Sequence, residues 1–362
     1  RRPAFELVVR EYVNCLSDVT FNSHAKVTDI GFNKQQPAAV SGVHVQGAGG
    51  DEFLTADVVI DASGRSGALA QMLTEHGVNL AADQRDSGVW YFTRHYRLKN
   101  GQEYPKFLGL PGAQFADFTS GAFPADNGYL TVTLQVYRED TALVATIKDP
   151  DHFQLICERI QSVAQWVDAA RCEPVSKVFG FGQMDSFWRK TVVDGEPQIL
   201  NYFFVGDSGL RSNPKYGRGC TWSTLAAHDL AELLAADLTP QIRAIRYEQS
   251  LEERFRADWL TMRNIDRASE RDFACAVNLQ RANLKQRIQQ YLRFLVEDAM
   301  LLEPALFREI WTGYNGFTNM DAWSRKPANL ARVARAWLQR GVFGDIVRSQ
   351  RGRLPRATMT RQ

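Results

Sequence analysis

The fold of this chain is decided by one stretch of its sequence, Phe204-Val205-Gly206-Asp207-Ser208-Gly209-Leu210-Arg211-Ser212-Asn213-Pro214-Lys215-Tyr216-Gly217-Arg218-Gly219-Cys220-Thr221. A buried apolar run leads into a carboxylate, then into a loop with proline and glycine, and then into the start of a helix. A carboxylate at a strand end can accept hydrogen bonds from a polyol, and glycines let the backbone approach a flat ring closely. The free N–H groups of a helix that begins near Cys220 suit a negatively charged ligand group. A strand, turn and helix without any ligand would use the same residues, so both interpretations stay open.

The segments on either side of this stretch predict a mixed α/β chain. Ala56–Asp61 contains consecutive apolar residues, which is typical of a strand covered on both faces in a parallel sheet. From about Ser87 to Lys190, aromatic and β-branched residues with turn signals between them predict an antiparallel sheet, interrupted by a helix near 151–167. Beyond Thr221 the apolar spacing is helical almost throughout. We therefore expect an α/β domain that resumes after an inserted β domain and is followed by helices.

The first residues of the chain predict an amphipathic helix. Apolar residues recur there with helical spacing, at Phe5, Val8, Val9, Tyr12, Val13 and Leu16, and Pro3 suits a first helical turn. Such a stripe is expected to pack against another element.

Composition and charge exclude several classes of protein. A formal charge of +2 gives no overall reason to expect nucleic acid as a partner, and five scattered cysteines suggest neither a disulfide framework nor a zinc or other metal site. The cysteine pattern fits a reducing cytoplasm best, so we expect a cytoplasmic protein. No apolar run approaches the roughly 20 residues that cross a bilayer, so we expect no transmembrane segment. Basic residues gather only from Arg325 onward. That tail is either solvated or makes peripheral contact with an anionic membrane surface or a partner protein, and a homo-oligomer is left open.

The stretch from Asp207 to Gly219 resembles a signature of the flavoprotein monooxygenase superfamily, G-D-x(6)-P-x-x-G-x-G. This superfamily has the p-hydroxybenzoate hydroxylase fold and includes geranylgeranyl-reductase-like and flavin-dependent halogenase branches. The fixed positions of the signature are occupied by Asp207, Pro214, Gly217 and Gly219. The segment 56–65 is similar to the middle motif of the same group, A-D-L-V-V-D-A-S-G-R, and 2–6 is similar to its arginine-led helix start. The resemblance covers roughly residues 1–234.

The resemblance implies FAD as the cofactor and assigns residues to it. Arg2 would meet the ribityl-pyrophosphate region, Val27 would present its backbone to the adenine, and Ala62 would lie near the cofactor. Asp207 would bind the ribityl chain. The isoalloxazine would be lined by Pro214, Gly217, Gly219, Cys220 and Thr221.

The chain departs from the family in two places. The G-x-G-x-x-G fingerprint for the FAD pyrophosphate and the acidic residue after it are absent, and Gly47-Ala48-Gly49-Gly50 is interpreted as a hairpin turn. We therefore expect that an N-terminal portion on the order of 100 residues is missing and that apolar surface is exposed beside Val58–Ile60. Gly67 and Ala70 replace the usual residues of the middle motif, which leaves NAD(P)H open as the electron donor. The halogenase motif W-x-W-x-I-P is also missing.

These observations predict an α/β fold with an incomplete Rossmann-like FAD-binding domain, an inserted antiparallel β substrate domain and a helical C-terminal part. The expected FAD-binding parts are 1–86 and 196–240, the substrate domain is 87–195, and the helical region with its basic tail is 241–362.

The expected activity is that of an FAD-dependent monooxygenase, which would act on a hydrophobic or aromatic small molecule through a flavin C4a-hydroperoxide. Polar groups among aromatics suggest a substrate pocket at Tyr91, Arg94, Tyr96 and Asp126, although each of them also suits an ordinary sheet position. Two alternatives stay open. One is a flavin-dependent reductase of isoprenoid double bonds, and the other is a truncated, non-catalytic remnant of such an enzyme.

Overall fold

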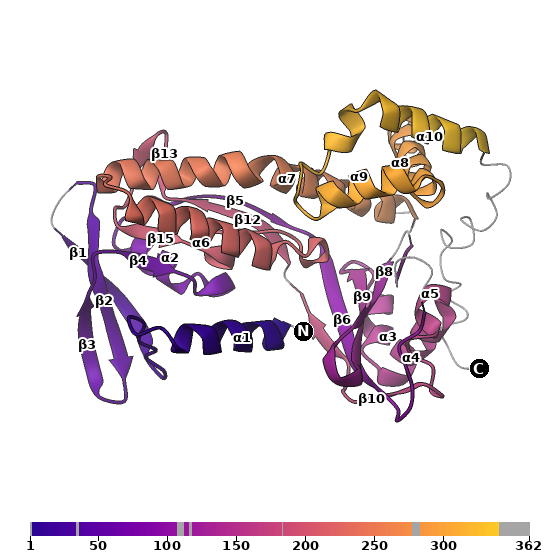
Figure 1. Cartoon of the computed structure of the whole chain (residues 1–362), viewed down its shortest axis with the longest axis horizontal. Coiled ribbons are helices and arrows are strands. Elements are labelled where there is room, and N and C mark those ends of the chain that lie inside the picture. Colours follow the sequence, from indigo (N-terminus) through magenta and orange to yellow (C-terminus); the bar gives the residue numbers. More distant parts are fainter. Residues whose placement is uncertain are drawn as a thin grey trace. The chain divides into compact units, whose positions relative to one another are not determined.

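The computed structural model describes residues 2–33, 36–106, 112–115, 118–182, 184–276 and 283–339, and Figure 1 shows their path. The chain divides into two compact units. The first consists of Arg2–Asp86 and Asp185–Arg263, and the second consists of Ser87–Met184 and Asn264–Gln362. Each unit is therefore assembled from two separate stretches of sequence.

The strands of the first unit form four small sheets. β1 (Lys26–Asn33), β2 (Ala39–Gly47) and β3 (Gly50–Thr55) are antiparallel, and the predicted glycine turn joins the last two. β4 (Val59–Asp61) pairs in parallel with β15 (Tyr202–Phe204). β5 (Ala81–Asp86), β12 (Asp185–Lys190) and β16 (Leu210–Arg211) form the third sheet, and the hairpin of β13 (Val192–Val193) and β14 (Glu196–Pro197) is the fourth.

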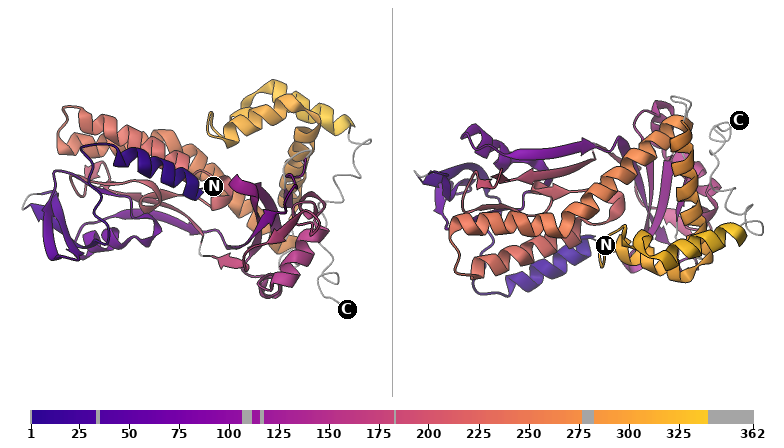
Figure 2. Two further views of the ribbon diagram at one scale, coloured as in Figure 1. Left: turned by 60° about the horizontal axis from the view of Figure 1, so that its bottom comes forward. Right: turned by 90° about the horizontal axis from the view of Figure 1, so that it is seen from above.

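The helices of the first unit are α1 (Arg2–Asn14), α2 (Ala68–Glu75), α6 (Gly219–Ala235) and the first part of α7 (Pro240–Ala276). α6 and this part of α7 run side by side along the sheets (Figures 1 and 2). The rings of Trp222 and Phe255 pack 5.3 Å apart between them. Arg254 of α7 donates two hydrogen bonds to the carboxylate of Asp229, at 2.8 and 2.9 Å. The two helices are thus held together by both apolar and ionic contacts.

Helix α1 forms where the sequence predicts it, but its apolar stripe is not packed. Val8 is 68% exposed and Tyr12 is 70% exposed. The expectation that the stripe packs on another element is therefore wrong for the part of the chain that the structure describes. A period of 3.6 shows that a helix has an apolar face, but it does not supply a partner for that face. The predicted apolar surface beside β4 is found at Ile60, which is 48% exposed.

The second unit is built on an antiparallel sheet, as predicted. Its order is β10-β6-β9-β8-β7, and β11 also pairs with β6. The bounds are β6 (Val89–Leu98), β7 (Gly112–Gln114), β8 (Phe118–Pro124), β9 (Tyr129–Tyr137), β10 (Cys172–Pro174) and β11 (Phe179–Phe181). Along β9, Leu130 and Leu134 are fully buried in the core, whereas Thr131 and Thr133 point to the opposite, half-buried face. The sheet therefore has one core face and a second face that is half-buried along this part of β9 and covered around Tyr91 and Tyr137.

Helices complete the second unit. α3 (Thr141–Ile147), α4 (Pro150–Arg159) and α5 (Gln161–Ala164) pack on the core face of the sheet, where Trp166 is fully buried. The later helices are the last part of α7, α8 (Leu284–Leu302), α9 (Pro304–Tyr314) and α10 (Pro327–Gln339), with short 3-10 turns at Asp126–Gly128 and Ala322–Arg325. The predicted helical character beyond Thr221 is confirmed within the described residues. None of the helices in these residues is long and apolar enough to cross a membrane.

Buried hydroxyl groups tie β15 to its neighbours in the first unit. The Tyr202 hydroxyl donates to the Asp61 carboxylate at 2.9 Å, and both residues are 1% exposed. The Tyr247 hydroxyl of α7 donates to the backbone oxygen of Phe204 at 2.8 Å. One bond therefore has a carboxylate acceptor and the other a neutral acceptor, in the same buried layer.

We predict that Tyr202→Phe lowers the free energy of unfolding by about 2 kcal/mol, because it leaves a buried carboxylate without one of its donors. The matched control, Tyr247→Phe, removes a hydroxyl from a neutral acceptor and should cost only about 1 kcal/mol. Urea denaturation of the whole chain measures both values. Equal costs would show that the Asp61 carboxylate does not depend on Tyr202.

Candidate cofactor site

The two parallel strands end side by side and bring two distant motifs together. The backbone oxygen of Asp61, at the end of β4, accepts hydrogen bonds from the Val205 N–H at 2.9 Å and from the Ser208 hydroxyl at 2.6 Å. Ser208 is completely buried. Ala62 is the first residue after β4 and Asp207 follows β15 after Val205 and Gly206, so both lie at the same edge of the sheet. Ligands of open α/β sheets bind at this kind of edge, beyond the carboxyl ends of the strands.

A short 3-10 turn, η3 (Gly206–Ser208), presents Asp207. Gly206 has a φ of +71°, and a Cβ at this position would come within 2.8 Å of the Ser223 hydroxyl oxygen on α6. The backbone oxygen of Asp207 accepts a hydrogen bond from Arg211 Nη1 at 2.9 Å. Its half-buried carboxylate has no hydrogen-bond partner within the described residues. The backbone of Asp207 is therefore tied down while its carboxylate remains available to a ligand.

The loop after this turn delivers the chain to the N-terminus of α6. The turn η4 (Pro214–Tyr216) is capped by Asn213, whose side-chain oxygen accepts from the Lys215 N–H at 3.2 Å. Gly217 then takes the left-handed conformation, with a φ of +64°. α6 begins at Gly219, and no side chain caps it. Because the first N–H groups of a helix have no partner within the helix, those of α6 are open to an external acceptor.

The surface formed by Asp207 and the loop fits the flavin half of FAD. A Cβ on Gly219 would lie 3.9 Å from Asp207 Oδ1, and a Cβ on Gly217 would meet no atom within 4 Å, so both glycines leave space for a flat ring. The residues that the resemblance assigns to the ring are all exposed; they are Pro214, Gly217, Gly219, Cys220 and Thr221. Negative charge on the ring would face the positive end of the α6 dipole.

An arginine-carboxylate cluster supports the strand from which this loop departs. Arg211 donates two hydrogen bonds of 2.7 Å to the carboxylate of Asp185, and Arg65 donates a third of 2.9 Å. Burial alone would raise the pKa of Asp185, but hydrogen bonding and charge from Arg211, followed by the charge of Arg65, lower it below its ordinary value. The carboxylate therefore stays ionised and holds both arginines beside the Asp61 and Asp207 strand ends.

Arg189 of β12 brings a further cation behind the loop. Its guanidinium lies 4.7 Å from the ring centre of Phe187 and 5.1 Å from that of Phe204. It also donates a hydrogen bond of 2.6 Å to the backbone oxygen of Ser208. Burial, and then the nearby charge of Arg211, lower the pKa of this group from its ordinary value. The Arg189 side chain therefore fixes the end of η3 through the contact of its planar guanidinium with two aromatic rings as well as through its charge.

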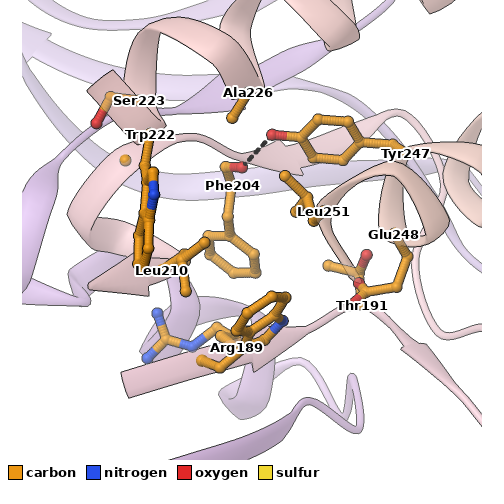
Figure 3. A pocket seen from close by; sticks show the side chains of 13 residues that line it. Arg189, Thr191, Phe204, Leu210, Trp222, Ser223, Ala226, Tyr247, Glu248 and Leu251 are labelled. Atoms are coloured by element: carbon orange, nitrogen blue, oxygen red, sulfur yellow. Dashed lines mark hydrogen bonds between the residues drawn. The ribbon is translucent and has the colours of Figure 1, made fainter. Parts of the chain in front are cut away.

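A small cavity lies between the sheets and the helices of this unit (Figure 3). Its volume is about 20 Å³, which is enough for roughly one water molecule. The lining residues come from β12, β15, η3, β16, α6 and α7, and they include Trp188, Phe204, Gly206, Trp222 and Glu248. The cavity therefore shares Phe204 and Gly206 with the loop that presents Asp207.

Glu248 is the ionisable carboxyl group of this cavity wall. Burial raises its pKa to about 7, and the opposing effects of Lys190, the Thr191 backbone and the Trp188 indole offset only part of that rise. Tyr247, one residue earlier, makes the hydrogen bond to Phe204 described above. Glu248 is therefore the neighbour, along α7, of the residue that holds the end of β15.

Two of the predicted cofactor residues are not part of this cluster. Val27 lies on β1, in the sheet of β1, β2 and β3. The side chain of Arg2 lies outside the described residues, although its backbone begins α1. The structure therefore brings together Ala62 and the segment from Asp207 to Thr221, and it does not place these two residues with them.

The four predicted substrate residues do not converge on one place. Tyr91 is buried on one face of the sheet of the second unit, and its hydroxyl donates to Gln135 Oε1 at 3.1 Å. Tyr96 is buried on the opposite face, in the core, and Arg94 lies on that same face, where it donates to the backbone oxygen of Pro150 at 2.9 Å. Asp126 is exposed in the turn before β9. Arg94 and Tyr96 thus serve the packing of α4 on the sheet.

Several residues that shape the site were not singled out from the sequence. They are Tyr202, Arg189 and Glu248, which lie on β15, β12 and α7. Ser208 was also missed, although it directly follows the predicted Asp207, which could have pointed to it. Nothing in the nearby sequence marks Tyr202, Arg189 and Glu248, because their partners are distant in the sequence. No group of three potential metal-ligating side chains occurs among the described residues.

Comparison with solved structures identifies proteins that share this fold. The flavin-dependent brominase Bmp2 superposes with a TM-score of 0.55 at 16% identity, over 88% of this chain and 76% of that one. PqsL of Pseudomonas aeruginosa, described as a probable FAD-dependent monooxygenase, gives 0.53 at 14% identity, over 75% and 69%. The chain has the fold of flavin-dependent monooxygenases and halogenases. The anhydrotetracycline hydroxylase OxyS of Streptomyces rimosus also matches, with a TM-score of 0.53 at 14% identity over 87% of this chain and 55% of its own.

Sequence comparison finds a relative that matches part of the chain. No family model matches the chain. The protein Rv3254 of Mycobacterium tuberculosis is 26% identical over 246 residues, which amount to 65% of this chain and 50% of that protein. The chain therefore spans about half the length of this curated relative. The predicted fold class is confirmed, whereas the roles of individual residues rest on the geometry described above.

We predict that Gly206→Ala lowers the free energy of unfolding by about 2 to 3 kcal/mol, because a left-handed alanine is strained and its Cβ would press on Ser223. Gly217→Ala has the same kind of φ in open space and should cost only about 1 kcal/mol. Adding Ser223→Ala should restore part of the loss in the first variant and nothing in the second. Thermal and urea unfolding measure the cycle, and a failure of Ser223→Ala to help would refute the contact.

We also predict a pH dependence of stability that comes from Glu248. Its folded pKa of about 7 lies above its ordinary value of 4.5, so the folded protein holds a proton that the unfolded chain releases between these values. The contribution is therefore complete below pH 4.5 and is lost as the pH rises to 7, by at most about 3 kcal/mol. Glu248→Gln should be the more stable protein at about pH 8. Parallel unfolding profiles for the two proteins would contradict the assignment.

Proposed function

We propose that this chain carries the flavin-binding half of an FAD-dependent oxidoreductase. The observation that supports this best is the Asp207 carboxylate, which has no partner in the described part of the chain and lies beside the uncapped N-terminus of α6, where β4 and β15 end. A carboxylate for a polyol and helix N–H groups for a negatively charged ring are the two kinds of group that a flavin needs. The fold shared with flavin-dependent enzymes supports the same cofactor.

In this proposal the protein binds and orients, and the cofactor carries the chemistry. Bound FAD supplies the redox step. Asp207 accepts hydrogen bonds from the ribityl hydroxyls, while Gly217 and Gly219 allow close approach of the ring. The N–H groups at the start of α6 stabilise negative charge on the ring. Arg189 and Arg211 fix the loop from behind and add positive potential to the same region.

For the reaction we propose monooxygenation of a hydrophobic or aromatic small molecule. Two of the proteins that share the fold are described as a monooxygenase and a hydroxylase, and the sequence resembles the same superfamily. The second unit offers a suitable surface on the half-buried part of the sheet face opposite the core, beyond the cluster around Tyr91 and Tyr137. There Thr93 pairs with Thr133 and His95 pairs with Thr131, both at 2.9 Å, and Phe179 on β11 is 44% exposed. Polar pairs beside an exposed ring suit an aromatic substrate that carries a polar group.

We predict that Asp207→Ala weakens FAD binding by at least about tenfold, because the ribityl hydroxyls lose a charged acceptor. The measurement is a titration of the purified chain with FAD, followed by the quenching of flavin fluorescence. Asp237→Ala, at an exposed carboxylate after α6, is the matched control and should bind like the unaltered chain.

Equal FAD affinity in the two variants, or no binding by the unaltered chain in excess FAD, would contradict the proposal. Once binding is established, product formation that stops without O2 supports monooxygenation. Product formation that continues without O2 would instead support the reductase of isoprenoid double bonds.

A further inference from the structure

The small cavity of the first unit is lined by two side chains that each bury a polar atom without a hydrogen-bond partner among the described residues. Oε1 of Glu248 and Nε1 of Trp188 are both buried, and neither has a hydrogen-bond partner at bonding geometry within the described residues. The indole nevertheless lies near enough to the carboxyl group to lower its pKa. Buried polar atoms of this kind are costly when left unpaired, so something must satisfy them in solution.

The charged groups around Glu248 are engaged elsewhere. Lys190, on β12, makes an ion pair with Glu252 on the next turn of α7. Arg256 also approaches Glu252, at 3.8 Å, and its guanidinium stacks on the ring of Trp188 at 5.3 Å. The remaining cation of the cavity wall, Arg189, is committed to the backbone oxygen of Ser208. From α6 and β15 the wall contributes no charged side chain. Glu248 therefore has no counter-ion of its own.

The space available matches a single water molecule. A water needs a cavity of at least about 10 to 15 Å³ and two to four polar partners. The cavity measures about 20 Å³. Glu248 and Trp188 supply two of the partners, one as acceptor or donor and the other as donor.

The same cavity touches the loop that presents Asp207. Phe204 and Gly206 line it from the loop side, and Gly209 lines it at the other end of η3. On the helix side, Tyr247 holds the backbone of Phe204 while the next residue is Glu248. A change in the hydration of this cavity therefore acts directly on the position of η3.

We propose that the cavity binds one water molecule between the Glu248 carboxyl group and the Trp188 indole, with Glu248 in its neutral form, and that ionisation of Glu248 loosens the Gly206–Gly209 loop. Only the description of this loop as flavin-binding rests on the proposed function. A carboxylate without a counter-ion draws more water than this cavity holds, so α7 and β12 must separate to hydrate it. The wall formed by Phe204 and Gly206 then loses its support.

Hydrogen exchange of the whole chain without FAD tests the coupling. At about pH 8, the amides of residues 203–209 should exchange at least about threefold faster in the unaltered protein than in Glu248→Gln, which keeps the neutral shape. At about pH 5.5 the two proteins should exchange alike, because both are then neutral at this position. Glu253→Gln, at an exposed position on the same helix, is the matched control and should follow the unaltered protein at both pH values.

A second measurement needs no variant. The indole N–H resonance of Trp188 should show a cross-peak to a bound water at low pH and should shift with a midpoint near the pKa of Glu248, which is about 7. Equal exchange of 203–209 in the unaltered protein and Glu248→Gln at about pH 8 overturns the coupling. An indole signal without a water cross-peak overturns the water site. Because FAD is absent from both experiments, a failure of FAD binding would count against the proposed function alone.

Discussion

The site depends on the hydrogen bonds that Asp61 makes with β15 and the turn after it. Asp61 accepts hydrogen bonds from the Val205 N–H and the Ser208 hydroxyl through its backbone oxygen, and from the Tyr202 hydroxyl through its carboxylate. These bonds are buried, so water does not compete for them. They join two segments that are more than a hundred residues apart in the chain. They add to the backbone pairing of β4 with β15, and Ala62 and Asp207 lie at the edge where these two strands end.

Around the hydrogen bonds of Asp61, the rest of the first unit restrains the backbone and leaves functional groups free to bind a ligand. Gly206 allows the tight turn, Arg189 and Arg211 donate to two of its carbonyl oxygens, and Asn213 caps the next turn. The Asp207 carboxylate and the first N–H groups of α6 are the groups left over. This division is what a binding site requires, because a ligand gains most from partners that are already in position.

The interior behind the loop also contains polar atoms without a hydrogen-bond partner. Within the described residues, Glu248 and Trp188 each bury such an atom, next to a cavity of about 20 Å³. Elsewhere in the same layer, Tyr202 and Tyr247 pair their hydroxyl groups fully. The raised pKa of Glu248 explains why this carboxyl group should make the stability of this unit fall as the pH rises from about 4.5 to 7.

The sequence by itself determined the elements that depend on neighbours in the chain. The strand, aspartate, loop and helix from 204 to 221 follow from local patterns, as do the helix at 2–14 and the alternation in β9. The separation of five residues between Tyr91 and Tyr96 already places them on opposite faces of a continuous strand, although their chemistry had suggested a common pocket. Only the tertiary structure decided which side chains meet across long separations. Asp61 with Tyr202, Arg211 with Asp185, and Glu248 with Trp188 are such pairs. It also showed that the α1 stripe stays exposed, because periodicity records that a face is apolar but not what covers it.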